Sequence, residues 1–149
     1  MNSDNKMSVQ VGLLYMVKRT RLIGLVIIGG ILIIYAIGAV MRQAVAEKEY
    51  EYLNIATFVF CILLCAASVI VRSRMMAKVN SKNYKGAYFT ANILPFALCD
   101  GGGIICITMS LFVNWNLIYA TAGLLVMVMA IVYNLPKESE IAEISERHG

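Results

Sequence analysis

Charge is scarce in this chain of 149 residues, since only 15% of them are Asp, Glu, Lys or Arg and 60% are hydrophobic. A typical soluble domain is roughly 25% charged. The charge is missing in blocks, and each block approaches or exceeds the ~20 apolar residues that cross the hydrocarbon core of a bilayer. The composition therefore excludes an ordinary soluble domain and indicates an integral membrane protein.

Histidine is almost absent, because His148 is the only one and lies next to the last residue. Its scarcity argues against an intramembrane haem with histidine ligands and against a histidine-rich metal site. The four cysteines, Cys61, Cys65, Cys99 and Cys106, include no C-x-x-C pair of the redox or zinc type. We interpret them as small packing residues and expect neither a bound metal nor a cofactor.

Catalytic motifs are missing as well. The sequence contains no P-loop, nucleophile elbow, zinc-ligand spacing or dinucleotide fingerprint. A catalytic serine or cysteine needs a histidine or lysine base beside it, and the long apolar segments contain neither. We expect that the protein is not an enzyme.

What the chain does contain is four long apolar segments, which predict an all-α fold: an integral membrane four-helix bundle. The segments are Leu22–Met41, Leu53–Val71, Ala87–Val113 and Leu117–Leu135. The first is too long for the apolar core of a signal peptide. We divide the chain into an N-terminal cytoplasmic or interfacial segment (Met1–Arg21), a transmembrane domain (Leu22–Pro136) and a cytoplasmic tail (Lys137–Gly149). Ile141 and Ile144 could give the tail one apolar stripe, but it is most simply a solvated end. Within the first, Val9–Val17 reads either as a short interfacial helix or as an extension of the first membrane helix.

The basic residues predict the topology. Lys and Arg near helix ends stay on the cytoplasmic side, and 11 of the 13 fall on one side when the segments alternate. The loop Arg72–Gly86 is then cytoplasmic, as are both termini, while Arg42–Tyr52 and Asn114–Asn116 lie outside. We read the basic residues as topology determinants and lipid contacts rather than as a nucleic-acid site. A bacterial inner membrane or an equivalent membrane is the expected location.

Asp100 is the only charge within the four apolar segments. An ionised carboxylate alone at the bilayer centre costs at least about 3 kcal/mol, so Asp100 must be protonated, paired or beside a wet cavity. Pro95 should kink the helix before it, and Gly101, Gly102 and Gly103 weaken the helix after it. We predict Asp100 as an ion-binding group for a proton or a monovalent cation. The alternative is a neutral carboxyl group hydrogen-bonded to Asn92, Thr57, Thr121 or the carbonyl freed by Pro95.

Small residues predict where helices approach each other closely, because membrane helices pack through glycine and alanine. The predicted packing positions are Gly29, Gly30, Ala97, Gly101, Gly102 and Gly103. A groove over Gly29 and Gly30 beside Asp100 is a sharper alternative to simple packing. A second set shares one helical face and is expected to face protein or to line a path to Asp100; it comprises Thr57, Cys61, Cys65 and Ser68.

The run Ala97–Ile105, with its acidic residue between small and aliphatic ones, resembles the carboxylate helix of the ATP synthase proteolipid, subunit c. The resemblance covers Ala87–Pro136, about one third of the chain. In that family the carboxylate binds the translocated proton or sodium ion, and the matching position here is Asp100. The chain differs from the family in having four apolar segments where the short form has two, and in lacking the Arg-Gln-Pro turn of the loop.

Three functions fit these observations. The first is a proton- or cation-coupled subunit of a membrane complex, with Asp100 as its ion site. The second is a non-catalytic accessory or assembly subunit, in which Asp100 pairs with a group of another membrane protein. The third, less favoured, is a small exporter of cationic compounds, for which Tyr35 would be the cavity aromatic. Because four helices are few for a complete transport path, the first two imply other membrane subunits or self-association.

Overall fold

The structure is a computed structural model that describes residues 3–41, 51–80 and 82–146. This part of the chain is helical and contains no β-strand, which confirms the predicted all-α class. The long helices are α1 (Ser3–Met41), α2 (Glu51–Met76), α3 (Tyr84–Thr108) and α4 (Leu117–Tyr133). A π-helical segment, η2 (Met109–Val113), continues α3, and a short helix, α5 (Ser139–Glu146), follows α4.

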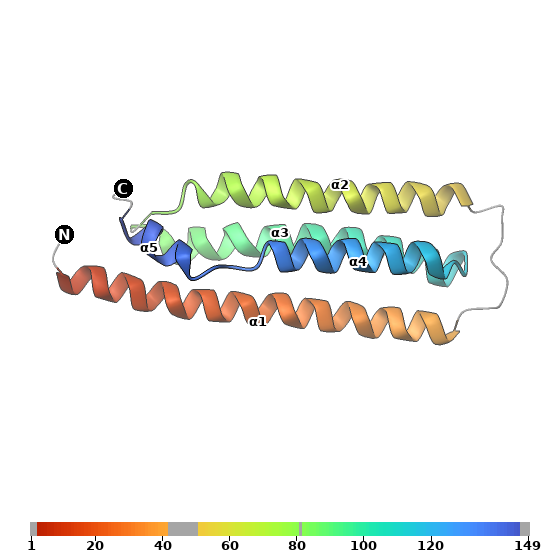
Figure 1. The fold of residues 1–149 in the computed structure, drawn as a ribbon, viewed down its shortest axis with the longest axis horizontal. Helices are drawn as coiled ribbons and strands as arrows, with labels where there is room; N and C mark the ends of the chain where they lie inside the picture. Colours follow the sequence, from red (N-terminus) through yellow and green to blue (C-terminus); the bar gives the residue numbers. More distant parts are fainter. Residues whose placement is uncertain (1–2, 42–50, 81, 147–149) are drawn as a thin grey trace.

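Helices α1 to α4 lie side by side, and successive helices run in opposite directions (Figure 1). In that view α3 and α4 lie between α1 and α2, and α3 contacts each of the other long helices. Helix α1 begins and α5 lies at the same end of the molecule, on the left in Figure 1, which we call the α5 end. Residues of α1, α3, α5 and the turn after α2 therefore come together at the α5 end.

Three helical segments are long and apolar enough to cross a bilayer: Met7–Met41, Glu51–Met76 and Tyr84–Val113. The fourth predicted segment forms a shorter apolar helix, Leu117–Tyr133. Its 17 residues give a length of about 26 Å at the usual 1.5 Å rise, near the lower limit for a span. Length and composition therefore support membrane association.

The helix bounds resolve two points that the sequence left open or placed differently. Helix α1 is continuous from Ser3, so Val9–Val17 extends the first long helix and is not a separate interfacial helix. Helix α2 runs to Met76, so Arg72 and Arg74 are helical and the next connection is shorter than the predicted loop Arg72–Gly86. Most of the predicted outer loop, residues 42–50, lies outside the described residues.

The predicted turn Asn114–Asn116 is confirmed. Helix η2 ends at Val113 and α4 begins at Leu117. The Asn116 side chain accepts hydrogen bonds from the backbone N–H groups of Ile118 and Tyr119. This cap satisfies N–H groups that the first turn of a helix leaves without partners, which explains why α4 begins where it does.

The buried apolar residues form two clusters. The larger cluster runs along the middle of the long helices and includes Phe96, Ile107, Leu111, Met127 and Ile131. The smaller one lies at the α5 end and is made of Val9, Leu13, Val17, Val79, Tyr88, Ala91 and Ile144. Ile144 is only 1% exposed, so the predicted solvated tail is wrong. Ile141 and Ile144 give α5 one apolar side, and burying that side holds the helix on the bundle.

Candidate functional site

Asp100 lies in the middle of α3 and is partly exposed. One turn earlier on the same side of the helix, Phe96 is fully buried, and its ring packs against Gly24 of α1. Helix α3 continues through Pro95, which is itself buried. Asp100 therefore sits at the edge of the contact between α3 and α1.

No described residue forms a hydrogen bond or an ion pair with the Asp100 carboxyl group. Each of the three side chains considered as partners from the sequence is engaged elsewhere. Asn92 accepts from Arg72 and donates to the Tyr88 carbonyl oxygen. The Thr57 hydroxyl group donates to carbonyl oxygens of its own helix, and Thr121 bonds to Tyr35 and Leu117. The three side chains of the alternative are therefore not bonded to Asp100 within the described structure, and its fourth partner, the carbonyl group freed by Pro95, stays a prediction.

The predicted packing residues divide into two groups. A Cβ atom added at Gly102 would lie 3.2 Å from the Cα atom of Cys61 in α2, and one added at Gly103 would collide with Met127 of α4. A Cβ atom at Gly29, Gly30 or Gly101 would meet nothing within 4 Å, and Ala97 is exposed.

The second group, whose positions have no neighbouring atoms or are exposed, indicates where a partner helix would bind. Within the described chain, nothing packs on Gly29, Gly30, Gly101 or Ala97. A helix that packs there must come from another chain, and that prediction stays open. Gly29 is partly exposed and Gly30 is exposed, and a groove over this pair beside Asp100 stays a prediction.

The weakly polar face of α2 points into the protein, as predicted. Thr57, Cys61, Cys65 and Ser68 are all buried, and the four cysteines are free thiols. Ser68 accepts a hydrogen bond from the Asn134 amide nitrogen at 2.9 Å, and the Cys99 thiol lies 3.1 Å from the same oxygen. The side chains of α2, α3 and α4 thus share a polar contact inside the bundle. Tyr35, the aromatic residue that the exporter hypothesis would place in a cavity, is also hydrogen-bonded: its hydroxyl oxygen lies 2.7 Å from the Thr121 hydroxyl oxygen.

A second polar group, which the sequence did not predict, lies closer to the α5 end. The Arg72 guanidinium donates to Glu140 of α5 at 2.7 Å and to the Asn92 side-chain oxygen at 3.0 Å. The second oxygen of Glu140 accepts from the hydroxyl group of Tyr88, at 3.0 Å. Arg72 and Glu140 are each 15% exposed, and Tyr88 and Asn92 are fully buried. These four residues, from α2, α3 and α5, form what we call the Arg72 cluster.

Arg21 of α1 fixes the chain just before α5. Its Nε atom donates to the Pro136 carbonyl oxygen at 2.8 Å, and its Nη1 atom lies 3.2 Å from a carboxylate oxygen of Glu138. The first contact is to the backbone and therefore fixes the position of the turn after α4. Together with the Arg72 cluster and Ile144, it attaches α5 to α1, α2 and α3.

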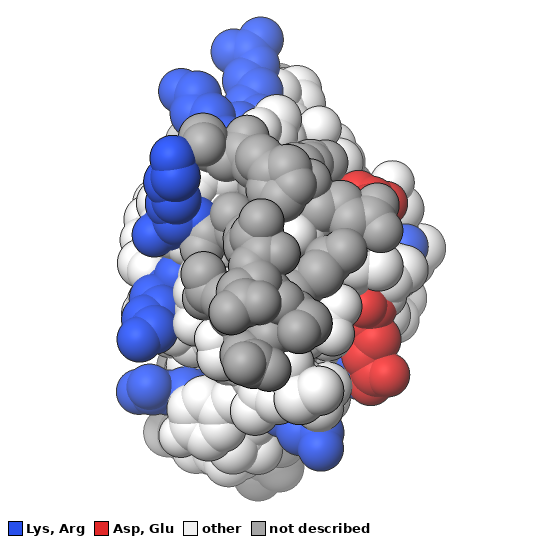
Figure 2. All heavy atoms as spheres, turned by 90° about the vertical axis from the view of Figure 1, so that its left-hand side faces the viewer, with Lys and Arg blue, Asp and Glu red and all other residues white. Residues whose placement is uncertain are grey.

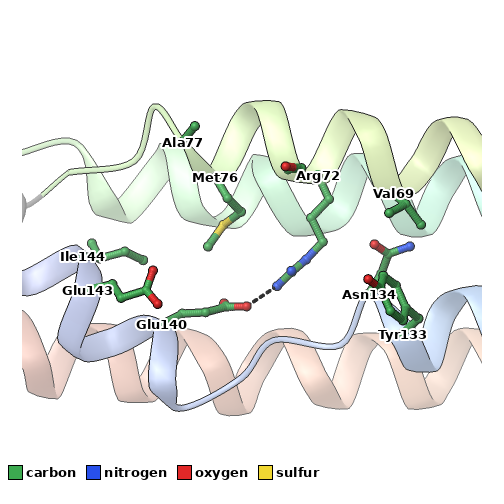
Figure 3. Close-up of a pocket in the computed structure, with 10 residues that line it drawn as sticks. Val69, Arg72, Met76, Ala77, Tyr133, Asn134, Glu140, Glu143 and Ile144 are labelled. Carbon is green, nitrogen blue, oxygen red and sulfur yellow. Dashed lines mark hydrogen bonds and ion pairs between the residues drawn. The ribbon is translucent and has the colours of Figure 1, made fainter.

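A pocket of about 390 Å³ lies beside the Arg72 cluster, between α2, the end of α4 and α5 (Figure 3). Its lining combines charged, polar and apolar side chains: Val69, Arg72, Ser73, Met76, Ala77, Tyr133, Asn134, Glu140, Glu143 and Ile144. This volume is within the 300–1,000 Å³ range of small-molecule sites in proteins. The pocket exists only because α5 is docked, since α5 supplies Glu140, Glu143 and Ile144.

The charges at the α5 end are separated on the surface. In a view onto this end, most visible Lys and Arg side chains lie along one edge, and Asp and Glu side chains lie on the opposite side (Figure 2). Six exposed basic residues come from α1, α2, the following turn and the start of α3, namely Lys18, Arg19, Arg74, Lys78, Lys82 and Lys85, and Lys137 before α5 is exposed as well. The guanidinium of Arg19 stacks over the ring of Phe89, 5.7 Å from its centroid. The basic edge is therefore partly held in place by α3.

Sequence patterns contained a signal for the Arg72 cluster. Ser68 and Arg72 are four residues apart on α2, and Tyr88 and Asn92 are four residues apart on α3; both pairs extend a polar helix face by one turn. Glu140 precedes Ile141 and Ile144 in a short amphipathic segment. The spacing identifies these faces, but it does not show that the tail folds back onto them.

Comparison of the chain with protein-family models, curated proteins and solved structures gives no match. The resemblance of Ala97–Ile105 to the subunit c helix therefore rests on those residues alone.

Proposed function

We propose that the chain is an integral membrane protein with four membrane-spanning helices and both termini in the cytoplasm. The support is the long apolar helices and their outward faces, which carry large exposed apolar side chains on every long helix, among them Leu25, Ile33, Leu63, Leu94 and Met129. Contiguous apolar surface of this kind marks contact with lipid or protein. The basic edge of the α5 end agrees with a cytoplasmic location for that end.

We further propose that Asp100 is a protonatable group that binds a proton or a monovalent cation within a membrane complex. The observation that carries this proposal is the carboxylate itself: it lies mid-helix in an apolar segment, partly exposed, without a partner in the described chain. Intramembrane carboxylates mark ion paths and proton relays. A carboxyl group that lipid keeps neutral and that ionises when water or a cation reaches it can take up and release a proton.

A second polypeptide completes this site. Asp100 lies at the edge of α3, and the neighbouring positions Gly101 and Ala97 are open. The described part of the bundle has a core filled with apolar side chains, among them Phe96, Ile107 and Met127. The partner is either another membrane subunit or a second copy of the chain, and its helix packs on the small residues next to the carboxylate. The resemblance to subunit c supports a protonatable group at Asp100.

The test compares Asp100→Asn, which cannot ionise, with Asp100→Glu. The protein is isolated in mild detergent with everything that co-purifies, its mass is measured, and the complex is reconstituted in vesicles. We expect Asn to preserve expression and assembly but to abolish proton or cation flux, and Glu to retain part of it. Wild-type flux in the Asp100→Asn variant would exclude the ion site.

A lipid-soluble carbodiimide gives a second readout that does not need flux. The reagent modifies only a protonated and accessible carboxyl group, so mass spectrometry should find it on Asp100. A bound cation should slow the modification, because it competes with the proton. Glu51, an exposed residue at the start of α2, is the control, and the cation should leave the extent of its modification unchanged.

The accessory subunit remains the second candidate, favoured by the same open face around Gly101. In that case Asp100 pairs with a basic or polar group of the partner, and Asp100→Asn should lower the mass of the complex. Loss of assembly with the Asn variant supports the accessory role, whereas loss of flux with intact assembly supports the ion site.

A further inference from the structure

The pocket between α2, α4 and α5 contains a buried acceptor atom whose hydrogen bond is not made within the described chain. Asn134 is 1% exposed, and its amide nitrogen donates to the Ser68 oxygen at 2.9 Å and to the Ala130 carbonyl oxygen at 3.0 Å. Because a carbonyl oxygen only accepts, the amide is oriented with its nitrogen toward Ala130. Its side-chain oxygen then faces the pocket, toward Arg72 (Figure 3). The pocket therefore offers a ligand one hydrogen-bond acceptor.

Arg72 brings hydrogen-bond donors to the same pocket. Its Nε atom donates to the Asn92 side chain, and its Nη2 atom donates to Glu140. A guanidinium has more N–H groups than these two contacts use, and its Nη1 atom forms no hydrogen bond with a described residue. Both side chains line the pocket, Arg72 from α2 and Asn134 from the end of α4 (Figure 3). A ligand between them can accept from Arg72 and donate to Asn134.

The charged side chains of the lining do not require an ionic ligand. Arg72 and Glu140 neutralise each other through their 2.7 Å contact, and Glu143 has an interaction of its own. An ion that entered the pocket would lose its hydration without meeting an unpaired charge of the opposite sign. The complementary ligand is therefore neutral.

Much of the remaining lining is apolar. Val69, Ala77 and Ile144 offer a surface that an alkyl chain can cover, and covering it is favourable. Among neutral groups, a hydroxyl group accepts and donates hydrogen bonds at a single oxygen atom. A water molecule would satisfy the same two polar side chains but would leave the apolar surface uncovered. The pocket volume of about 390 Å³ thus fits a hydroxyl group that carries an alkyl body.

We propose that this pocket binds the hydroxyl group of a neutral amphiphile, which bridges Arg72 and Asn134 while its alkyl body contacts Val69 and Ile144. The hydroxyl oxygen accepts a hydrogen bond from the Arg72 guanidinium, and the hydroxyl group donates one to the Asn134 side-chain oxygen. The pocket lies near the end of α2, where a lipid headgroup would reach it, so the hydroxyl group belongs either to a free alcohol or to a glycerol lipid. The proposal does not depend on a role for Asp100.

The experiment uses the full chain in phosphatidylcholine nanodiscs with methyl-labelled isoleucine. Hexanol is the probe, and the comparison ligands of similar size are chlorohexane, which has no hydroxyl group, and hexylammonium, which is charged. We expect a saturable NMR shift of the Ile144 methyl group with hexanol, and binding of both comparison ligands that is weaker by about fivefold or more. Ile118, which is 79% exposed at the opposite end, should show no saturable shift.

Substitutions separate the binding of the hydroxyl group from the stability of the fold. Asn134→Ala removes the acceptor oxygen, and we expect the affinity for hexanol to fall about fivefold or more. Ser68→Ala removes a hydrogen bond of the same amide nitrogen, but Ser68 does not line the pocket, so this variant should bind hexanol like the wild type. If Asn134→Ala does not fold, Val69→Phe fills the pocket from its apolar side and should abolish the saturable shift.

A second arm distinguishes the source of the hydroxyl group. Monooleoylglycerol added to the nanodiscs has hydroxyl groups in its headgroup, whereas methyl oleate has none. A saturable shift at Ile144 with monooleoylglycerol alone would assign the site to a glycerol lipid, and one with hexanol alone would assign it to a soluble alcohol. The proposal is overturned if neither gives a saturable shift, if chlorohexane or hexylammonium binds as tightly as hexanol, or if the Asn134→Ala or Val69→Phe variant binds like the wild type.

Discussion

Arg72 of α2 and Glu140 of α5 form an ion pair at 2.7 Å in which both side chains are only 15% exposed. The two residues are 68 positions apart in the sequence, and the pair joins the last helix of the described chain to the long helices. It is also hydrogen-bonded on both sides, to Asn92 and to Tyr88. An ion pair whose other hydrogen bonds are satisfied can be buried at little cost, whereas one charged residue that is buried without its partner destabilises the fold.

Removing Arg72 should therefore cost more than removing the charge of its partner. Arg72→Ala leaves Glu140 buried without a cation and Asn92 without a donor, and we expect a loss of about 3 kcal/mol. Glu140→Gln keeps one acceptor oxygen for Arg72, and its amide N–H group can donate to the Tyr88 hydroxyl oxygen instead of accepting from it, so we expect a smaller loss of about 1 kcal/mol. Thermal unfolding in detergent measures both losses of stability, and the loss for Arg72→Ala should be the larger. Arg74→Ala, an exposed position on the same helix, should have little effect, and an equal loss for Arg74 would refute the role of the pair.

The docking of α5 should depend on Ile144. Its side chain is 1% exposed among residues of α1 and α3, and truncating a buried isoleucine to alanine costs about 2–5 kcal/mol. Because α5 is short and terminal, we expect Ile144→Ala to release α5 while the long helices stay folded. Hydrogen exchange should then become fast in 139–146 and remain slow in α3. Ala142→Ser, at an exposed position of α5, is the control; slow exchange in both variants would show that Ile144 does not hold the helix.

Substitutions at two glycines of α3 should have different effects, one on the stability of the single chain and the other on its association with other chains. Gly103→Leu places a large side chain against Met127 of α4, and we expect it to lower stability by about 1–3 kcal/mol, as overpacking does. Gly101→Leu meets open space, so the single chain should stay as stable as the wild type while its association with other chains is reduced. Thermal unfolding measures the first effect and the mass of the detergent complex the second. Leu125→Ala is a control on the exposed face of α4, and unchanged mass for Gly101→Leu would mean that no helix packs there.

Topology is tested by labelling introduced cysteines from each side of the membrane. The native cysteines are buried and are replaced by alanine. Lys82→Cys lies near the α5 end and Glu51→Cys at the opposite end, both at exposed positions. We expect an impermeant maleimide to reach the first only from the cytoplasmic side and the second only from outside. The reverse pattern would invert the proposed orientation.

The sequence alone determined the features that depend on local composition and spacing. Apolar length predicted the all-α class, because a chain in lipid must satisfy its backbone hydrogen bonds within helices. Polar turn residues placed the connection Asn114–Asn116, and spacing of three or four residues placed Thr57, Cys61, Cys65 and Ser68 on one buried face. The same reasoning marked Asp100 as exceptional, because a single charge within a long apolar segment is visible in the sequence and is costly in lipid unless it is neutralised or paired.

Only the tertiary structure decided which faces meet. Glycines look alike in a sequence, yet Gly102 and Gly103 pack within the chain and Gly29, Gly30 and Gly101 do not, because the difference lies in the rotation of each helix about its axis. The same holds for Arg72 and Glu140: each reads as a charge near a helix end or in a polar tail. Their contact requires α5 to fold back onto the bundle, and that depends on Ile144 finding a buried place between α1 and α3. Neither the composition nor the periodicity of α5 shows where that place is.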